Sequence, residues 1–504
     1  MMKFINYRKV CSLFDVRYAS LHASLEAEAK SKKGFLKNNR WRFNNKAKGL
    51  IVFAIIAVML VSVFAFLPKG NNTVPNVPQS SDSPTASPST TPQETNPTNN
   101  PTNKPDPISQ ITRNIIAWGG DVAQVLTPAK PPGTIESAGT MNSDVWRAVA
   151  ANAWKYFQPG TGVDANTGLP YAGGTDSPNF TDWDLGVYIQ AVIDANKTGL
   201  IGTDGDWNSS ARLEKVVSFL ETRDLNSYNY PYWFYQARDG KNFKANSDSA
   251  TGPVDGVDTG RLFVALNNLR QFNISLASRI NNLVLHGRSN YAALVPNIKT
   301  ESLNSNSIYF YYVASGFASF WPNELSSAPS QILTNILSSG NVTTNGVWLP
   351  KASILGDPLL CSVFEIGNNS QLMSITKQVY LAHEAYYNAT GQYRAFSEGA
   401  SLSDRWNYEW VALSDGRTWA TLDESGSNYS ITPVIYTKIS VGFLAIYNTT
   451  FARNMTIYLE QTLPDPTRGY CEGVDESGAH LEGVGLNTNG LILGAAKYAI
   501  QNNP

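Results

Sequence analysis

Histidine and cysteine are scarce in this sequence of 504 residues, which holds four histidines and three cysteines. The histidines are scattered and no two have the spacing of metal ligands, so the sequence indicates no metal site. Cys11 lies near the N-terminus, and Cys361 and Cys471 lie far along the chain. The two later cysteines fit a disulfide and a pair of buried thiols equally well.

Familiar catalytic and cofactor-binding motifs are also missing. The sequence has no G-x-S-x-G nucleophile elbow, H-E-x-x-H zinc motif, Walker loop or dinucleotide-binding fingerprint, so we expect no cofactor. The motif DANTG at 164–168 resembles the start of a calcium loop, but its glycine comes one residue early and the distal glutamate is missing. We interpret it as a turn. Charged residues make up only 16% of the chain, the net charge is −1, and no motif predicts binding to nucleic acid.

One long apolar run stands near the N-terminus. Residues 50–67 read LIVFAIIAVMLVSVFAFL, in which Ser62 is the only polar residue, and about twenty apolar residues span a bilayer. Residues 1–48 contain twelve Lys or Arg against three Asp or Glu, and such basic flanks stay cytoplasmic. A cleaved signal peptide would have a shorter basic region and a shorter apolar core. The sequence therefore predicts a basic cytoplasmic tail at 1–48, a single transmembrane helix in the lipid bilayer at 49–67, and an extracellular remainder.

The segment at 68–110 differs in composition from everything around it. It is rich in Pro, Ser, Thr and Asn, as in SSDSPTASPSTTPQETNPTNN. Such a composition buries too little apolar surface to offset the entropy lost on ordering. We predict a disordered extracellular stalk that holds the following domain away from the cell membrane. Every Asn-x-Ser/Thr acceptor site for glycosylation lies beyond the apolar run, which agrees with this topology.

Helical periodicity dominates the remaining domain, at 111–504. Apolar residues recur at steps of three or four, as on one face of a helix, in these segments: 145–157, 185–192, 213–220, 262–269, 276–287, 307–320, 328–338, 370–389, 434–447, 452–463 and 487–500. One strand-like patch at 393–419 carries a turn at Asp415-Gly416. This many helices with long loops fit a closed ring of helical hairpins, in which loops at one end can converge on a single site.

Carboxylates in loops rich in glycine and aromatic residues are the candidates for chemistry. Hydrolysis of a glycosidic bond needs one acid to protonate the leaving oxygen and one carboxylate to activate water or attack the sugar. Asp184 and Asp258 stand at predicted helix starts, where capping is the favoured role. Glu398, Glu472 and Glu476 lie in loops without such a role. The wider set of candidates also includes Asp182, Asp255, Glu409, Asp475 and Glu482.

The same segments resemble a known family. The chain from Trp146 to Ala499 is similar to family 3131 of domains of unknown function, described as glucoamylase-like. The matching pieces, in the family's order, are WKYF (154–157), TGLPY (167–171), TDWDLGVYIQA (181–191), GVDTGRLFVAL (256–266), LGDPLL (355–360), FSEG (396–399), DGRTW (415–419), DPTRGYCEGVDESG (465–478) and NTNGLIL (487–493). The resemblance implies an all-α fold, an (α/α)6-type toroid with a small β patch, and distant kinship with glycoside hydrolases active on β-1,2-glucan.

Together these observations predict a membrane-anchored, outward-facing glycoside-hydrolase-like enzyme that acts on an envelope or environmental polysaccharide. We predict Glu398 and Glu476 as the acid and the base or nucleophile, with Glu472 as the next candidate. The residues expected to bind sugar are Asp184, Asp258, Trp183, Trp233, Trp406 and Trp410. Two alternatives stay open. One is a non-catalytic glycan-binding or surface-structural protein on the same toroid. The other is a polysaccharide lyase, which would need a cluster of Arg or Lys in the loops that the sequence does not show.

Overall fold

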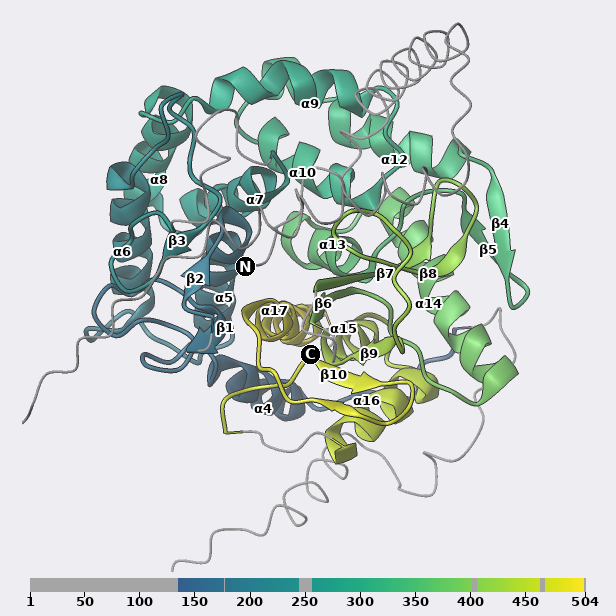
Figure 1. Ribbon diagram of the computed structural model, residues 1–504. Helices are drawn as coiled ribbons and strands as arrows, with labels where there is room; N and C mark the ends of the chain where they lie inside the picture. Colours follow the sequence, from purple (N-terminus) through teal and green to yellow (C-terminus); the bar gives the residue numbers. More distant parts are fainter. Residues whose placement is uncertain (1–134, 176, 244–255, 401–405, 463–466, 503–504) are drawn as a thin grey trace, which may run out of the picture. The chain divides into compact units, whose positions relative to one another are not determined.

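Six helices of the computed structural model contact one another in a closed circle (Figure 1). Each packs against the next in the order α5, α7, α10, α13, α15 and α17, and α17 also packs against α5. These inner helices span Asp182–Lys197 (α5), Gly256–Phe272 (α7), Ile308–Ala318 (α10), Gly356–Cys361 (α13), Thr437–Tyr447 (α15) and Leu486–Asn502 (α17). The structure describes residues 135–502 apart from 176, 244–255, 401–405 and 463–466.

An outer helix lies against each inner helix. The outer partners are α4 for α17, α6 for α5, α8 for α7, α12 for α10, α14 for α13 and α16 for α15, and Figure 1 shows them outside the circle. They span Ser143–Trp154 (α4), Ser209–Thr222 (α6), Ile274–Asn281 (α8), Ala328–Ser338 (α12), Ser370–Thr390 (α14) and Thr450–Thr462 (α16). Six such pairs make an (α/α)6 toroid, which confirms the predicted fold of this domain.

Short helices connect or extend the main ones. The α-helices α9 and α11 span Val295–Ser302 and Pro322–Leu325. A π-helix continues α8 at Asn282–His286 (η4), a second continues α13 at Ser362–Ile366 (η6), and a 3₁₀ turn spans Tyr291–Leu294 (η5).

Burial differs between the two layers. Every residue of α5 from Asp182 to Ala195 is buried, because inner helices have protein on all sides. The outer helix α6 buries one stripe that includes Leu213, Val216, Val217 and Leu220. The outer layer therefore has the one-sided apolar pattern of a surface helix, whereas the inner layer is apolar nearly all round.

Glycines allow the inner helices α7 and α10 to approach closely. A Cβ added to Gly316 would lie 2.1 Å from the backbone oxygen of Gly260, and a Cβ on Gly260 would lie 2.8 Å from Val313 Cα. Since such distances are far inside van der Waals contact, neither position has room for a side chain.

Among the residues that the structure describes, short strands lie between the helices in four small antiparallel sheets. Two sheets have three strands, in the orders β6-β7-β8 and β11-β10-β9, and two are the pairs β2-β3 and β4-β5. The strands span Ala172–Thr175 (β1), Asn179–Phe180 (β2), Tyr235–Gln236 (β3), Asn341–Thr344 (β4), Val347–Pro350 (β5), Glu398–Ala400 (β6), Trp406–Ala412 (β7), Thr418–Leu422 (β8), Val434–Tyr436 (β9), Gly473–Asp475 (β10) and His480–Leu481 (β11).

Most sequence-based element predictions are confirmed, including the strand patch and its turn, where Gly416 donates to the carbonyl of Leu413. The predicted helix at 434–447 is wrong at its start, because Val434–Tyr436 pairs with β10 and the helix begins at Thr437. The inner helix α13, the hairpin β4-β5 and the sheet β9 to β11 were not predicted.

The predicted tail (1–48), transmembrane helix (49–67) and stalk (68–110) lie outside the described residues. Within the residues that are described, no helix has the length and apolar character needed to cross a membrane.

Candidate active site

Side chains from the first turns of five inner helices meet at one end of the helix circle. Trp183 of α5 contacts Tyr309 of α10 and Asn487 of α17. Tyr309 in turn contacts Glu398, whose backbone is bound by Lys438 of α15, and Lys438 pairs with Asp357 of α13. Because helix starts carry a partial positive charge, this end of the domain favours negatively charged groups.

Glu398 is the first residue of β6, and the residue is only 2% exposed. The hydroxyl of Tyr309 donates to Oε1 at 2.7 Å, and Oε2 has no hydrogen-bond partner among the described residues. Burial, together with the nearby charge of Asp357, raises the pKa of Glu398 from 4.5 to about 8, although Lys438, Tyr309 and Trp406 favour the anion. A pKa raised in this way favours the protonated form of Glu398 at neutral pH.

Asp357 and Lys438 form a buried ion pair beside Glu398. The ammonium Nζ of Lys438 lies 2.6 Å from Asp357 Oδ2 and donates to the backbone oxygen of Glu398 at 2.7 Å. Burial raises the pKa of Asp357, and the charge of Lys438 opposes that rise. The Lys438 side chain is fully buried in the first turn of α15, a position that the helix dipole makes unfavourable for a cation. The surrounding carboxyls offset this cost.

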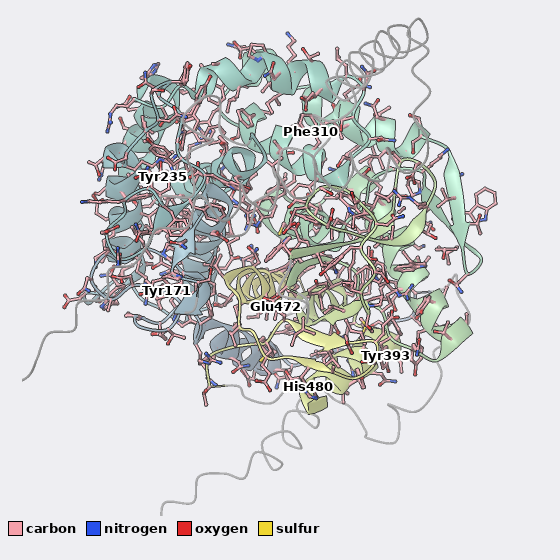
Figure 2. All side chains as sticks on the ribbon, viewed as in Figure 1. Tyr171, Tyr235, Phe310, Tyr393, Glu472 and His480 are labelled. Carbon is pink, nitrogen blue, oxygen red and sulfur yellow. The ribbon has the colours of Figure 1, made fainter. Side chains whose placement is uncertain are left out.

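Glu472 lies just before β10, and Figure 2 labels it beside α17. Its Oε2 accepts a hydrogen bond from Thr488 of α17 at 2.8 Å. A Cβ added to Gly399 would lie 3.2 Å from this oxygen, and a Cβ on Gly485 would lie 2.2 Å from Oε1. The carboxyl of Glu472 is therefore packed against the residue that follows Glu398. Burial raises the pKa of Glu472, while Lys438 and Thr488 favour its anionic form.

Two of the predicted tryptophans lie beside these carboxyls. The ring of Trp183 is 5.4 Å from that of Tyr309, and its Nε1 donates to Asn487 Oδ1 at 3.1 Å. Trp406 pairs with Ala400 across β6 and β7, and its indole lies close enough to Glu398 to favour the anion. Trp410 is buried further along β7. Trp233 is half-buried and packs against Phe234.

Asp184 caps α5, as the sequence predicts. Its Oδ2 accepts from the backbone N–H of Thr181, whose hydroxyl in turn accepts from the backbone of Asp184, which completes a capping box. Burial raises the pKa of Asp184 to about 6. The charges of Asp184 and Glu472 both raise the pKa of Tyr156, so Asp184 lies near the cluster. Asp258 is buried in the first turn of α7.

Glu476 has a different environment from the one expected of a catalytic base. Both of its oxygens accept from Arg394, at 2.6 and 3.0 Å, in a two-pronged ion pair. The guanidinium of Arg394 also stacks on Tyr386, 3.8 Å from the ring centre. Both oxygens of Glu476 are therefore engaged in holding Arg394. Glu472, the next candidate from the sequence, is the carboxyl that packs against Gly399, beside Glu398.

Three residues of the cluster were missed by sequence reasoning: Tyr309, Asp357 and Lys438. Asp357 stands in the family segment LGDPLL, but a short helix that contains a proline gives little periodic signal. Lys438 had the clearest signal, because it is one lysine inside the otherwise apolar stretch VIYTKISVGFLAIY. A buried lysine needs a carboxylate partner, and this requirement could have led to Asp357.

Several secondary predictions have clear outcomes. Asp164 of DANTG accepts from the backbone N–H groups of Asn166 and Thr167, so the motif is a turn, as predicted. Cys361 and Cys471 are both buried and do not form a disulfide. Among the described residues no group of three or more His, Cys, Asp or Glu side chains has the arrangement of a metal site.

A cavity of about 690 Å³ lies at the opposite ends of the inner helices, lined in part by Lys197, Phe272 and Gln501. Glu365 is the one carboxylate among its described lining residues, and that carboxylate is bound by Arg261 and Tyr312. Glycoside hydrolysis needs both an acid and a base, and one carboxylate that is already ion-paired cannot fill both roles. We therefore place the candidate active site at the helix starts, where Glu398 and Glu472 lie together.

The six helical pairs make this domain an (α/α)6 toroid, and the carboxyl cluster lies at one end of it. Residues 148–502 match the family described as "Protein of unknown function (DUF3131)", and the chain belongs to this family. This confirms the resemblance seen in the sequence. None of the curated protein sequences matches the chain.

The fold is similar to two solved structures. One is a glucoamylase-like protein from Bacteroides caccae, with a TM-score of 0.51 and 14% identity over 71% of this chain and 93% of that chain. The other is an endo-β-1,2-glucanase from Chitinophaga pinensis in complex with sophorotriose and glucose, with a TM-score of 0.51 and 13% identity over 72% of this chain and 96% of that chain. At such identities the likeness concerns the fold alone.

Proposed function

We propose that this protein is a glycoside hydrolase that cleaves a glucan with Glu398 as general acid and Glu472 as base or nucleophile. The observation that carries the proposal is the contrast between the two carboxyls. Glu398 is buried with one oxygen unpartnered among the described residues, and its raised pKa favours the protonated form at neutral pH. Burial raises the pKa of both carboxyls, but at Glu398 the charge of Asp357, which favours the proton, has a larger effect than that of Lys438. At Glu472 the charge of Lys438, which favours the anion, has the larger effect, and Thr488 donates to the carboxylate. Two carboxyls in such different environments suit the two halves of glycosidic hydrolysis.

In the proposed reaction Glu398 gives its proton to the glycosidic oxygen as the bond to the anomeric carbon breaks. Tyr309 donates to Glu398 Oε1 and so leaves Oε2 to carry the proton towards the substrate. Glu472 then removes a proton from the attacking water, or attacks the anomeric carbon itself. The hydroxyl of Thr488 holds one Glu472 oxygen in place during either step.

The substrate class follows from three features taken together. The two similar solved structures are a glucoamylase-like protein and an endo-β-1,2-glucanase, and the second is bound to sophorotriose and glucose. Trp406 lies next to Glu398 and is only partly buried, so its ring offers a flat surface for a sugar, whereas Trp183 is buried. The ammonium of Lys438 is already paired with Asp357, so it is not available to bind an acidic sugar, and a neutral polysaccharide is favoured. We therefore propose a glucan, with β-1,2-linked chains as the first to test.

We also propose that the enzyme is anchored in the cell membrane with its catalytic domain outside. The support is the sequence: a basic tail, an apolar run at 50–67 and a stalk-like segment precede the toroid. An anchored enzyme of this kind would act on polysaccharide of the envelope or the surroundings.

The test is release of reducing ends from a panel of glucans by the purified full-length protein in detergent. We expect cleavage of at least one glucan, and a loss of roughly 10²–10⁴-fold in turnover for Glu398→Gln and for Glu472→Gln. The matched control is Glu476→Gln, which changes the same side chain outside the cluster and should retain turnover. Binding of a glucan without release of reducing ends would instead favour the non-catalytic glycan-binding alternative.

A further inference from the structure

Lys438 binds both the backbone and a carboxylate of the candidate site. Its ammonium contacts Asp357 Oδ2 at 2.6 Å and the Glu398 backbone oxygen at 2.7 Å. Asp357, Glu472 and Glu398 all stabilise the charge of Lys438, and the ring of Tyr436 lies 5.3 Å from Nζ. A fully buried cation with this many partners restrains three segments that are far apart in the sequence.

The charges in this cluster do not balance if every carboxyl is ionised. Asp357, Glu398 and Glu472 would together carry three negative charges against the single positive charge of Lys438. Arg261 of α7 also acts on Asp357, but its own guanidinium is paired with Glu365. Lys438 is bonded directly to Asp357, so these two residues together carry no net charge. Glu398 and Glu472 would then repel each other if both were ionised. A single proton on one of these two carboxyls removes the repulsion between them.

We propose that Asp357 and Lys438 are a positioning pair: Lys438 fixes the backbone of Glu398, and Asp357 neutralises the ammonium that would otherwise draw the proton off the Glu398 carboxyl. This proposal rests on the role of Glu398 as the acid. Asp357 supplies a negative charge that disfavours a second anion, and Lys438 prevents Asp357 from taking the proton itself. Tyr309 from α10 and Thr488 from α17 bind Glu398 and Glu472 from the other sides of the cluster.

The test compares Asp357→Asn with the double variant Asp357→Asn/Lys438→Met. The single variant removes the negative charge and leaves the ammonium facing Glu398. Glu398 should then lose its proton at a lower pH, and the alkaline limb of the pH–rate profile should move down by roughly one to three pH units. The double variant removes both charges, so the limb should return towards the wild-type position. The plateau rate of the double variant should stay below that of the wild type, since Lys438→Met also removes the hydrogen bond to the Glu398 carbonyl.

A second readout needs no substrate and separates this proposal from the proposed function. The infrared carbonyl band of a protonated carboxyl, assigned by its loss in Glu398→Gln, reports the proton on Glu398 directly. In the full-length wild-type protein the band should persist through neutral pH, and in Asp357→Asn it should disappear at a lower pH. These band shifts would support the pair even if no glucan were cleaved.

Two results would overturn the proposal. One is an Asp357→Asn protein that is folded by circular dichroism and has the wild-type band titration. The other is a double variant whose alkaline limb lies further from the wild type than that of the single variant. Loss of all turnover in Asp357→Asn with an unchanged titration would make Asp357 itself a catalytic residue.

Discussion

Replacing Glu398 by Gln should stabilise the protein near pH 8 while it removes activity. The pKa of Glu398 is about 8 in the folded protein against 4.5 for an ordinary glutamate. A raised pKa means that the folded state binds the proton more tightly than the unfolded state does. Stability from this group is therefore complete below about pH 4.5 and is lost as the pH rises towards 8. A glutamine has no such dependence.

The size of the effect follows from the same values. Each pKa unit between the folded and unfolded states is worth about 1.4 kcal/mol, so the full difference approaches about 5 kcal/mol near pH 8. Asp357 shares in this titration, and the new amide N–H₂ would replace an oxygen that has no partner among the described residues, at a cost of roughly 1–3 kcal/mol. We expect a net gain on the order of 1–3 kcal/mol at pH 8 and no gain at pH 4.

The assay is urea unfolding of the full-length protein in detergent, followed by circular dichroism at several pH values. The matched control is Glu476→Gln, which leaves the guanidinium of Arg394 without its carboxylate and should destabilise by roughly 1–3 kcal/mol. If Glu398→Gln were less stable than the wild type at both pH 4 and pH 8, the environment that we assign to Glu398 would be incorrect.

Two further predictions concern the position of Glu472 and the topology of the chain. Gly485→Ala would place a Cβ 2.2 Å from Glu472 Oε1, so the carboxyl must move. Turnover should fall on the order of 10²-fold although Glu472 is still present. Unchanged kinetics would show that the position of this carboxyl does not matter. Protease added to intact cells should remove the toroid and spare residues 1–48, since the basic flank predicts a cytoplasmic tail; protection of the toroid would reverse the proposed orientation.

The sequence predicted the architecture better than the chemistry, for physical reasons. The outer helices have one apolar stripe each, as in α6, and periodicity finds such helices directly. The inner helix α13 has only six residues and a proline, so periodicity did not predict it. Only the family segment LGDPLL marked this part of the chain. Family segments also located Glu398 and Glu472 without giving their environments.

The choice between Glu472 and Glu476 shows where sequence reasoning stops. The two residues lie four positions apart in one family segment, and both appear as loop glutamates. What separates them is Arg394, which is 82 positions from Glu476 in the chain and binds both of its oxygens. Likewise Asp357 and Lys438 are 81 positions apart, and only the closed circle of helices brings them together. Partners this distant leave no local pattern.

The most direct measurement of the central claim is a crystal structure of Glu398→Gln with a bound glucan oligosaccharide. Our account predicts a sugar chain across the starts of the inner helices, with a glycosidic oxygen within about 2.6–3.2 Å of the substituted side chain at position 398 and the adjoining anomeric carbon facing Glu472. A chain seated instead in the cavity at the opposite helix ends, or one that crosses the helix starts with no glycosidic oxygen near position 398, would contradict it.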